Sequence, residues 1–411
     1  MDDLELNYER LILMSKLRTI DDINVANKKV LVRVDFNVPI EDGDVSSDAR
    51  IKQVIPTIVE LLKKGAKVIL ASHLGRPKGE KVPDLSLKII EQTLRTNLPG
   101  VDISFVADVV GSAAKSAANK LAQGQVLLLE NLRYEAGEET NDLGLATKLA
   151  GLADIYVDDA FSCAHRSHAS IQAVAKLLPS VAGRLMEKEI GILSRVLETP
   201  KLPLAAIIGG SKISSKLGVL KNLATKVQYL IIGGAMANTF LYAKGHNVGT
   251  SLCEVGMTEV VNEILVSASN HDCKVVIPID VVVAKALEAN IETENVMVEQ
   301  VPQEKMILDV GHGSIKKLGE ICKICRTVIW NGPLGAFEVS PFDVGTIAVA
   351  EKVVEFTRAG KLMSVVGGGD TVAALERVGA EHAFTYTTMA GGAFLEWLEG
   401  RILPGVEVLE D

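Results

Sequence analysis

The stretch that most constrains this chain is VLVRVDFNVP, at residues 30–39. Its β-branched residues and its alternating pattern predict a β-strand. Side chains alternate between the two faces of a strand, so the valines and Phe36 share one face, and Arg33, Asp35 and Asn37 share the other. Burying these polar groups without partners would cost about 2–7 kcal/mol each.

An exposed antiparallel strand would avoid this cost. However, Pro39 ends the predicted strand just beyond Asn37, which places the polar groups near its carboxyl end. Open α/β sheets bind ligands at the carboxyl ends of their strands. We therefore interpret Arg33, Asp35 and Asn37 as part of a binding site.

The length and composition limit the class of protein. A chain of 411 residues exceeds a typical single core, which predicts two domains. The net charge of −9 argues against a general nucleic-acid binder. Five cysteines, an odd number in a long chain, favour a reducing compartment over a disulfide framework.

Two further features concern cysteine and the start of the chain. Cys322 and Cys325 form a CxxC motif in a helical pattern with no second Cys/His pair nearby, so we interpret them as packing thiols rather than a zinc or redox site. No apolar run approaches the length of a membrane span, and the acidic start lacks the basic region of a signal peptide. We expect a cytoplasmic protein, with Met14 as an alternative first residue.

Strand-like and helix-like runs alternate along the chain, which predicts repeated βα units. The expected fold is α/β, with two doubly wound, Rossmann-like parallel-sheet domains joined by a helix. Residues 183–198 have helical periodicity and no turn signal, and Pro200 ends the pattern. We expect this helix to link the domains.

Basic residues follow the predicted strands of the first half. Strands at 67–72, 126–130 and 154–158 run into loops that carry His73, Arg76, Arg133, His165, Arg166 and His168. The carboxyl ends of parallel strands share one edge of a sheet, so we expect these residues to meet Arg33 there. A basic site on an acidic protein suggests a small substrate that bears phosphate or carboxylate groups.

The histidine pair of these loops and Arg50, which lies elsewhere in the first half, each have an alternative interpretation. His165 and His168 have the spacing of a metal pair, but no carboxylate or cysteine stands at ligand spacing, so we favour phosphate contact. Arg50 lies in the first turn of a helix for which Asp48 is the expected N-cap, and the helix dipole disfavours a cation there. A bound anion would remove that conflict, although a solvated arginine is the alternative.

Glycines follow five predicted strands of the second half, at 204–208, 229–232, 306–310, 327–330 and 364–366. Glycine after a buried strand lets backbone N–H groups approach a phosphate, and the following helix N-terminus favours the anion. We expect all five turns on one sheet edge. There is no Walker A loop, and no GxGxxG follows the opening strand, which argues against a nicotinamide dehydrogenase.

Three kinds of polar residue accompany these glycines. Asp370, after three glycines, suits either a Mg²⁺ ligand near phosphates or an N-cap of the next helix. Lys212 and Lys216 are four residues apart, so on a helix they would share a face and repel unless an anion lies beside them. Glu338 could accept hydrogen bonds from ribose hydroxyls, although a solvated glutamate is equally consistent with the local sequence.

With these motifs in their order, the chain resembles the phosphoglycerate kinase family from about residue 29 to residue 410. The motifs are VLVRVDFNVP, SHLGRPKG, ENLRY, AHRSH, GGSKISSK, GGAMANTF, WNGPLGAFE and GGGDT. The resemblance implies a glycolytic two-domain enzyme that transfers a phosphoryl group, with Mg²⁺, between 1,3-bisphosphoglycerate and ADP, giving 3-phosphoglycerate and ATP. It also implies hinge bending, a monomer, and no nucleic-acid or membrane partner.

The resemblance also implies the site residues. Catalysis is expected from Arg50, Lys212, Gly368 and Gly391. Binding of the glycerate and its distal phosphate is expected from Arg33, Asp35, Phe36, Asn37, Arg50, His73, Leu74, Gly75, Arg76, Arg133 and Arg166. Nucleotide binding is expected from Lys212, Lys216, Gly234, Gly311, Asn331, Glu338, Gly367, Gly368, Gly369, Asp370 and Thr371, with Asp370 on Mg²⁺.

The implied domains are residues 1–182 for the phosphoglycerate, residues 183–392 for the linking helix and the nucleotide, and residues 393–411 returning to the first domain. The chain departs from the usual family pattern in two places. Met389 and Ala390 stand in the hinge segment usually read STGGG, and Ser162 and Cys163 stand in the loop usually read FGTAHR. A binding protein that keeps the fold without activity is the remaining alternative; the presence of Arg50, Lys212 and Asp370 argues against it.

Overall fold

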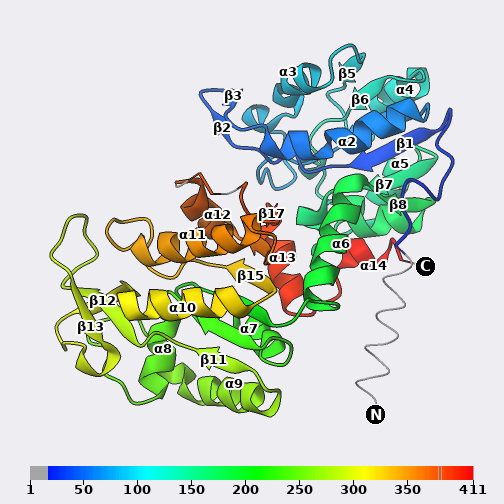
Figure 1. The fold of residues 1–411 in the computed structure, drawn as a ribbon. Helices are drawn as coiled ribbons and strands as arrows, with labels where there is room; N and C mark the ends of the chain where they lie inside the picture. The colour runs from blue at the N-terminus through cyan, green and yellow to red at the C-terminus, as the bar shows by residue number, and fades with distance from the viewer. Residues whose placement is uncertain (1–16, 378, 381, 411) are drawn as a thin grey trace. The chain divides into compact units, whose positions relative to one another are not determined.

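The computed structural model describes residues 17–377, 379–380 and 382–410 (Figure 1). Met14 lies outside the described residues. The chain forms two compact units, one of residues up to Gly191 together with those from Ile402 onward, and one of Ile192–Arg401. These limits lie slightly beyond the domain boundaries expected from the sequence, after residues 182 and 392; that functional division stays a prediction.

The first unit is built on a six-stranded parallel sheet. Its strands, in spatial order, are β5 (Ile103–Phe105), β6 (Val126–Leu128), β4 (Lys67–Ala71), β1 (Lys29–Arg33), β7 (Ile155–Asp158) and β8 (Ser180–Ala182). The helices of this unit are α2 (Ala49–Lys63), α3 (Lys88–Asn97), α4 (Ser112–Lys120), α5 (Leu143–Ala150) and α14 (Pro404–Glu407). A small hairpin, β2 (Ile40–Glu41) and β3 (Asp44–Val45), follows β1.

Strand β1 is central and is covered on both faces. Val30 and Val32 pack in one hydrophobic cluster with α2 and α3, and the same cluster continues to Phe36. Leu31 packs on the opposite face with residues of α4 and α5. The predicted apolar face is therefore confirmed, but the strand ends at Arg33 rather than near Pro39, so the polar residues beyond Arg33 lie on a loop at the sheet edge.

The second unit has its own six-stranded parallel sheet, in the order β11 (Lys274–Val276), β10 (Tyr229–Ile232), β9 (Leu204–Ile208), β15 (Thr327–Asn331), β16 (Met363–Gly367) and β17 (Tyr386–Thr388). Its helices are α7 (Leu217–Leu223), α8 (Ala235–Ala243), α9 (Thr258–Asn270), α10 (His312–Ile324), α11 (Val344–Arg358), α12 (Gly369–Glu376) and α13 (Gly391–Leu398). Two doubly wound parallel-sheet units are thus the fold that the sequence predicted.

A three-stranded antiparallel sheet was not predicted. It pairs β13 (Glu294–Met297), β12 (Asp280–Ala284) and β14 (Met306–Val310). The strand before Gly311 belongs to this sheet, so the expectation of five glycine turns on one edge was wrong: four of those strands lie in the parallel sheet. Periodicity within β14 is the same in either sheet, which is why the pattern did not separate them.

Helix α6 (Arg184–Leu197) is the predicted linking helix. The side chain of Asp159, which follows β7, stabilises the first turn of α6. One of its carboxylate oxygens accepts the backbone N–H groups of Leu185 at 2.8 Å and Met186 at 3.1 Å. For α2, Asp48 occupies the N-cap position as expected, but its side chain makes no capping hydrogen bond. It pairs instead with Lys52 at 2.9 Å, so the capping role predicted for it is wrong.

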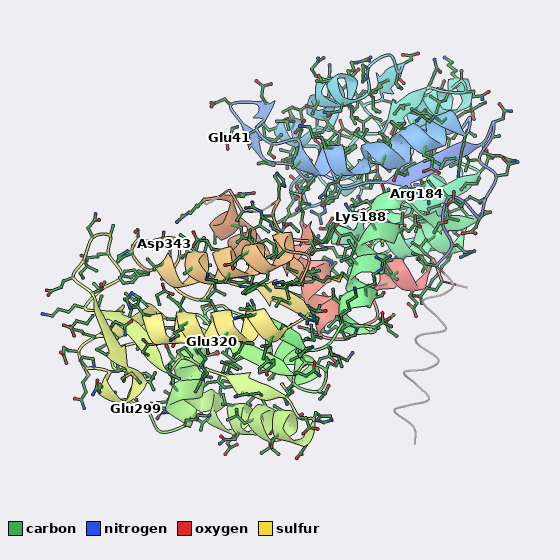
Figure 2. All side chains as sticks on the ribbon, viewed as in Figure 1. Glu41, Arg184, Lys188, Glu299, Glu320 and Asp343 are labelled. Atoms are coloured by element: carbon green, nitrogen blue, oxygen red, sulfur yellow. The ribbon has the colours of Figure 1, made fainter. Side chains whose placement is uncertain are left out.

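The cysteines and the charged residues lie in the environments that the composition suggested. Cys322 and Cys325 are free thiols packed in the core of the second unit beside Trp330, as predicted, and burial raises the pKa of each to about 12. Acidic side chains such as Glu41 and Glu320 are exposed (Figure 2). Among the described residues, no helix has the length and apolar character needed to cross a membrane.

Candidate active site

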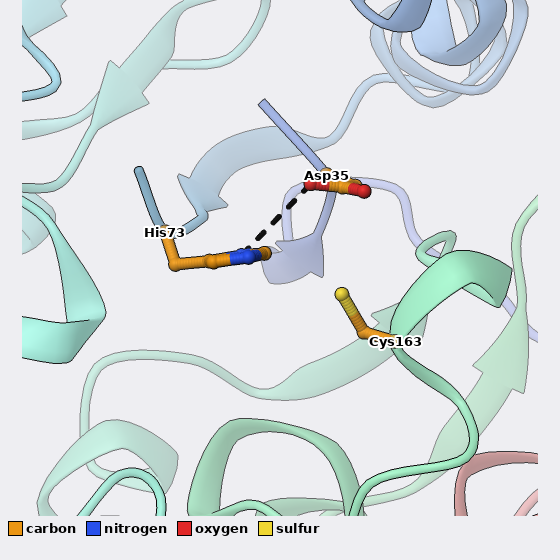
Figure 3. Close-up of side chains that lie close together, drawn as sticks. All are labelled: Asp35, His73 and Cys163. Atoms are coloured by element: carbon orange, nitrogen blue, oxygen red, sulfur yellow. Dashed lines mark ion pairs between the residues drawn. The ribbon is translucent and has the colours of Figure 1, made fainter. Parts of the chain in front are cut away.

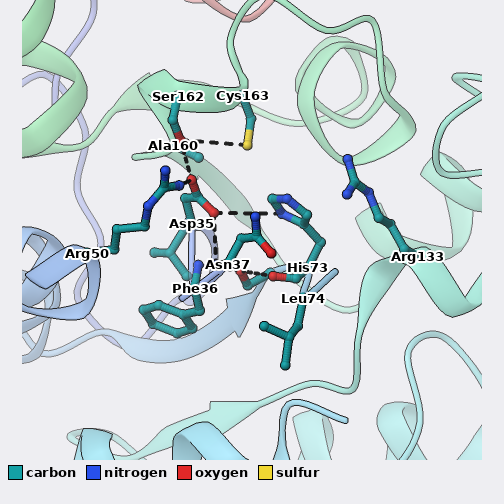
Figure 4. Close-up of polar contacts among 12 residues, drawn as sticks. Asp35, Phe36, Asn37, Arg50, His73, Leu74, Arg133, Ala160, Ser162 and Cys163 are labelled. Carbon is teal, nitrogen blue, oxygen red and sulfur yellow. Dashed lines mark hydrogen bonds and ion pairs between the residues drawn. The ribbon is translucent and has the colours of Figure 1, made fainter. Parts of the chain in front are cut away.

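Asp35 is the centre of a polar cluster just beyond β1 (Figure 4). One of its oxygens accepts the Asn37 backbone N–H at 3.0 Å, and the other accepts the Ser162 hydroxyl at 2.5 Å and pairs with the Arg50 guanidinium. Burial would raise the pKa of Asp35, but the contacts with His73, Arg50 and Ser162 outweigh burial and lower it. Asp35 is therefore an ionised acceptor at neutral pH.

His73 lies beside Asp35, with 3.9 Å between its Nδ1 and a carboxylate oxygen. Burial, together with the charges of Arg33, Arg133 and Arg166, holds its pKa well below 6.5. We conclude that His73 is neutral at pH 7. It can therefore share its surroundings with the arginines without adding a further positive charge.

Arg33 is almost completely buried, with 1% of its surface exposed. Its guanidinium contacts Ser170 Oγ at 2.9 Å and His73 Nδ1 at 3.2 Å. Behind it, the fully buried carboxylate of Glu138 accepts the backbone N–H and the hydroxyl of Ser170, at 3.0 and 2.6 Å. Burial alone would lower the pKa of Arg33, but Cys163, Glu138 and Asp35 raise it, so the arginine stays charged.

Asp35, His73 and Cys163 are buried residues of metal-ligating types, with ligand atoms within 4.8 Å of one another (Figure 3). A guanidinium nitrogen of Arg33 lies 3.2 Å from His73 Nδ1 and 3.8 Å from Cys163 Sγ. A positive group thus already contacts two of the three ligand atoms. Like charges disfavour a second cation there, so we do not assign a metal to this cluster.

The other predicted basic residues differ in exposure. Arg133 is buried and donates to the Gly75 carbonyl at 2.7 Å, while Asn37 Oδ1 accepts the Gly75 N–H at 2.9 Å. Arg166 is partly buried and donates to His165, and Arg76 is exposed. The predicted edge thus brings together Arg33, Asp35, Arg50 and His73, with Arg133 and Arg166 close enough to affect the pKa of His73.

Two predicted binding residues in this region, Phe36 and Leu74, have core side chains. The Phe36 side chain lies in the hydrophobic core, and its N–H donates to Ser72, so it does not face the polar cluster. Leu74 is also a core residue. His168 Nδ1 lies 3.6 Å from a carboxylate oxygen of Glu138, whereas His165 Nε2 accepts a hydrogen bond from Arg166. The two histidines therefore have separate partners, consistent with our preference against a metal pair.

The second unit contains a cavity of about 580 Å³. Gly234, Glu338 and Asp370, all predicted nucleotide residues, line it, together with apolar residues such as Leu252, Leu287 and Met306. A mostly apolar cavity with a few polar groups at its margin is typical of a site for a small molecule or cofactor. Gly311 and Asn331 are not among the lining residues.

Asn331 instead positions Lys216. The Lys216 ammonium donates to Asn331 Oδ1 at 2.7 Å and to the Gly209 carbonyl at 2.5 Å. Burial lowers the pKa of Lys216 to about 8, against the opposing effect of Asp370. Lys212 is exposed, and α7 begins only at Leu217, so the two lysines lie before this helix and the condition for a shared helical face is not met.

The GGGDT motif forms the turn from β16 into α12. Gly368 has a φ of 99°, a conformation that glycine adopts at little cost, and Gly369 and Asp370 lie in the first turn of α12. Gly367 accepts the amide of Asn331 at 2.8 Å, and Thr371 accepts the Gly332 N–H at 2.6 Å. Gly391 is the first residue of α13.

Two residues near the first site were missed by sequence reasoning. Glu138, which stabilises Arg33, is one of several acidic residues in a loop, and nothing in the pattern separates it from its neighbour Glu139. Ser162 was noted only as a departure from the usual loop. Its position before Cys163 in the loop after β7 was the available signal.

The comparisons agree with this geometry. The profile of the family described as phosphoglycerate kinase matches residues 20–401. A phosphoglycerate kinase of Ruegeria sp. is 52% identical over 393 residues, covering 96% of this chain and 99% of the relative. One of Methylorubrum extorquens is also 52% identical, over 397 residues, with coverage of 96% and 99%.

Solved structures are similar as well. The structure of phosphoglycerate kinase from Coxiella burnetii has a TM-score of 0.88 at 38% identity, covering 95% of this chain and 98% of that one. The enzyme from Pyrococcus horikoshii has a TM-score of 0.79 at 30% identity, with the same coverage. This chain therefore belongs to the phosphoglycerate kinase family.

Proposed function

We propose that the chain reversibly transfers a phosphoryl group between 1,3-bisphosphoglycerate and ADP, giving 3-phosphoglycerate and ATP. Family membership makes it a phosphotransferase of glycolysis that uses ATP or ADP as co-substrate. The observation that best supports the residue roles below is the cluster of guanidinium groups around an ionised Asp35 and a neutral His73. Such a cluster suits a small substrate that carries a hydroxyl, a carboxylate and a phosphate.

In this proposal Asp35 and Asn37 contact the glycerate. Arg33, His73, Arg76, Arg133 and Arg166 form the region that receives its distal phosphate. Because Asp35 is ionised, it can accept a hydrogen bond from a substrate hydroxyl. The neutral His73 limits the repulsion among the surrounding cations.

Arg50 has a different proposed role. In this structure it pairs with Asp35, and 28% of its side chain is exposed. We propose that it turns from Asp35 to the transferred phosphoryl group when substrate is bound. The attacking carboxylate of 3-phosphoglycerate is already ionised at neutral pH, so no general base is required, and catalysis consists of positioning and charge stabilisation.

The cavity of the second unit is the proposed adenosine site, with Glu338 near the ribose. Lys212 is proposed to meet the transferred group from the nucleotide side, while Lys216 and the turn at Gly367–Thr371 hold phosphates. Each unit holds one substrate in this proposal, so transfer requires the bound substrates to be brought together with water excluded. Residues 387–392 and the ends of α6 are the proposed hinges.

Asp370 fits the requirements of a Mg²⁺ ligand. It is an exposed carboxylate in the first turn of α12, it lines the cavity, and its charge affects the pKa of Lys216. Mg²⁺ is usually held by one or two carboxylates together with substrate phosphates, and when bound it would neutralise phosphate charge. We further propose a cytoplasmic monomer with no nucleic-acid or membrane partner; the net charge of −9 supports the absence of nucleic acid.

A coupled assay tests the proposal directly. Wild-type protein would receive ATP, Mg²⁺ and 3-phosphoglycerate, and formation of 1,3-bisphosphoglycerate would be followed with and without a chelator. We expect activity that requires Mg²⁺, is lost in Lys212→Ala and is kept in Lys221→Ala, an exposed lysine of α7 that pairs with Glu263. A folded wild-type protein without activity would contradict the proposal and favour a binding protein.

The pKa of Lys216 gives a second test. Because its pKa is about 8 in the free protein, part of the population lacks the positive charge above that pH. An anionic nucleotide favours the ammonium, so ADP affinity should fall as the pH rises through 8, by up to about tenfold per pH unit. Calorimetry at about pH 8.5 in two buffers of different ionisation enthalpy should detect proton uptake on ADP binding.

The Lys216→Met variant should bind ADP more weakly and without this proton uptake, while Lys221→Met should behave as wild type. Proton uptake of equal size in wild type and Lys216→Met would show that another group titrates.

A further inference from the structure

We infer that Ser162 is a positioning residue for the transfer reaction: its hydroxyl holds the Asp35 carboxylate in place when Arg50 leaves it for the substrate. This inference rests on the proposed function and extends it to a residue outside the predicted site. Two donors, the Ser162 hydroxyl and the Arg50 guanidinium, share one oxygen of Asp35.

The oxygens of Asp35 have different surroundings (Figure 4). Oδ1 accepts the Asn37 N–H at 3.0 Å and faces His73. Oδ2 accepts both the Ser162 hydroxyl at 2.5 Å and the Arg50 guanidinium. Ser162 thus binds the same atom as the cation that the proposed mechanism requires to move.

Ser162 is held on a rigid turn. It is the middle residue of the short helix η4 (Phe161–Cys163), and its two neighbours are 1% and 4% exposed, whereas Ser162 itself is only partly buried. The Cys163 N–H donates to the Ala160 carbonyl at 2.8 Å. The buried neighbours anchor the turn, so the hydroxyl is presented to Asp35 with little freedom.

The C-terminal segment packs against the residue that follows this turn, Ala164. The Gly405 N–H donates to the Ala164 carbonyl at 2.8 Å. A Cβ at Gly405 would lie 2.9 Å from the Ala164 Cα, closer than such atoms approach, so the two segments are packed together. This packing fixes the position of Ala164, the residue that directly follows η4.

Arg50 approaches Asp35 from a different element, the first turn of α2. Its side chain is partly exposed at the start of α2. If it turns toward a phosphoryl group, the buried Asp35 loses its cationic partner but must keep its orientation toward the substrate hydroxyl. A hydrogen bond from a hydroxyl to a carboxylate is among the stronger kinds in proteins, and Ser162 can supply it throughout the turnover.

The test compares steady-state kinetics of wild type, Ser162→Ala, Ser162→Thr and Ser167→Ala. Ser162→Ala removes the hydroxyl, and Ser162→Thr keeps it. Ser167 is an exposed serine of the same loop and serves as the matched control. The measurements are kcat, the KM for 3-phosphoglycerate, the KM for ATP and the melting temperature of each protein.

We expect Ser162→Ala to lower kcat/KM for 3-phosphoglycerate by about tenfold to a hundredfold, since hydrogen bonds to charged groups are of that strength. The KM for ATP should stay within about twofold of wild type, because Ser162 belongs to the unit that does not carry the nucleotide cavity. Ser162→Thr should recover most of the loss, and Ser167→Ala should match wild type.

Each other result has one meaning. An inactive wild type would overturn the proposed function itself. An active wild type with equal kinetics in Ser162→Ala would overturn only the role of Ser162. A loss in Ser162→Ala that Ser162→Thr shares, or that comes with an equal rise in the KM for ATP and a lower melting temperature, would assign Ser162 a structural role and overturn the inference.

Discussion

We expect the Arg50→Ala variant to transfer the phosphoryl group about 10²–10³-fold more slowly than wild type, the usual cost of losing one donor to a developing charge. In the structure Arg50 is partly exposed and pairs with Asp35, so it lies close to the proposed glycerate site. Its proposed contact with the transferred group forms during the reaction, so its loss lowers kcat more than it raises the KM for either substrate.

The measurement is kcat in the coupled assay beside the dissociation constant of ADP from calorimetry. ADP affinity should be unchanged, because the nucleotide cavity lies in the other unit. Lys52→Ala is the matched control, since Lys52 is an exposed cation of the same helix that pairs with Asp48. Turnover near that of wild type in Arg50→Ala would refute the role given to this residue.

The largest expected loss of stability follows replacement of Glu138 by leucine. The Glu138 side chain is completely buried, accepts two hydrogen bonds from Ser170, and interacts with Arg33. Removing it leaves both Ser170 donors without their acceptor and takes away a buried negative charge that favours the Arg33 guanidinium. Leaving a buried charge uncompensated in this way costs about 3–5 kcal/mol. Urea unfolding at pH 7 measures the change.

The pH dependence of this loss has a definite sign. Burial would raise the pKa of Glu138, but His168, Arg33 and Ser170 outweigh burial and lower it below the usual 4.5. The folded state therefore favours the ionised carboxylate, and this contribution to stability is present above pH 4.5 and is lost as the pH falls through the folded pKa. The difference in the free energy of unfolding between wild type and Glu138→Leu should therefore become smaller as the pH is lowered below 4.5.

Glu139→Leu provides the control for this experiment. Glu139 is half-exposed and pairs with Arg133 at 3.1 Å. Arg133 is buried, but the Glu139 carboxylate is open to solvent, which screens the pair, so the variant should lose less stability to urea than Glu138→Leu. Equal destabilisation by the two leucine variants would contradict the assignment of Glu138 as the buried carboxylate that stabilises Ser170 and Arg33.

The limits of several strands and of one helix could be predicted from the sequence, because they depend on residues close together in the chain. β9, β10 and β14 have the predicted limits, and α6 begins and ends within one residue of the expected range. Continuous apolar runs ended by glycine, and a 3.6-residue periodicity ended by proline, are properties of a few neighbouring residues. The meeting of Arg33 with His73 could also be anticipated, because parallel strands place their carboxyl ends on one edge.

Other parts of the site depend on which strands are neighbours. β14 has the pattern of a buried strand, but it pairs antiparallel with β12 in a separate sheet. Its residues 306–310 line the cavity, whereas Gly311 just beyond them does not. Asn331 matches the family motif for nucleotide binding, yet its side chain holds Lys216. In both cases the local sequence is correct for a turn at the end of a strand and says nothing about the partner across the turn.

The two parallel-sheet units, the linking helix and the family could be predicted from the chain alone, because each follows from local periodicity or from motifs in order. The ionised state of Asp35, the neutral state of His73 and the roles of Glu138 and Ser162 in stabilising the charges around them became visible in the folded protein. The physical reason is that a charge state depends on burial and on charges contributed by residues as far apart as 35 and 162, and neither is a property of the adjacent sequence.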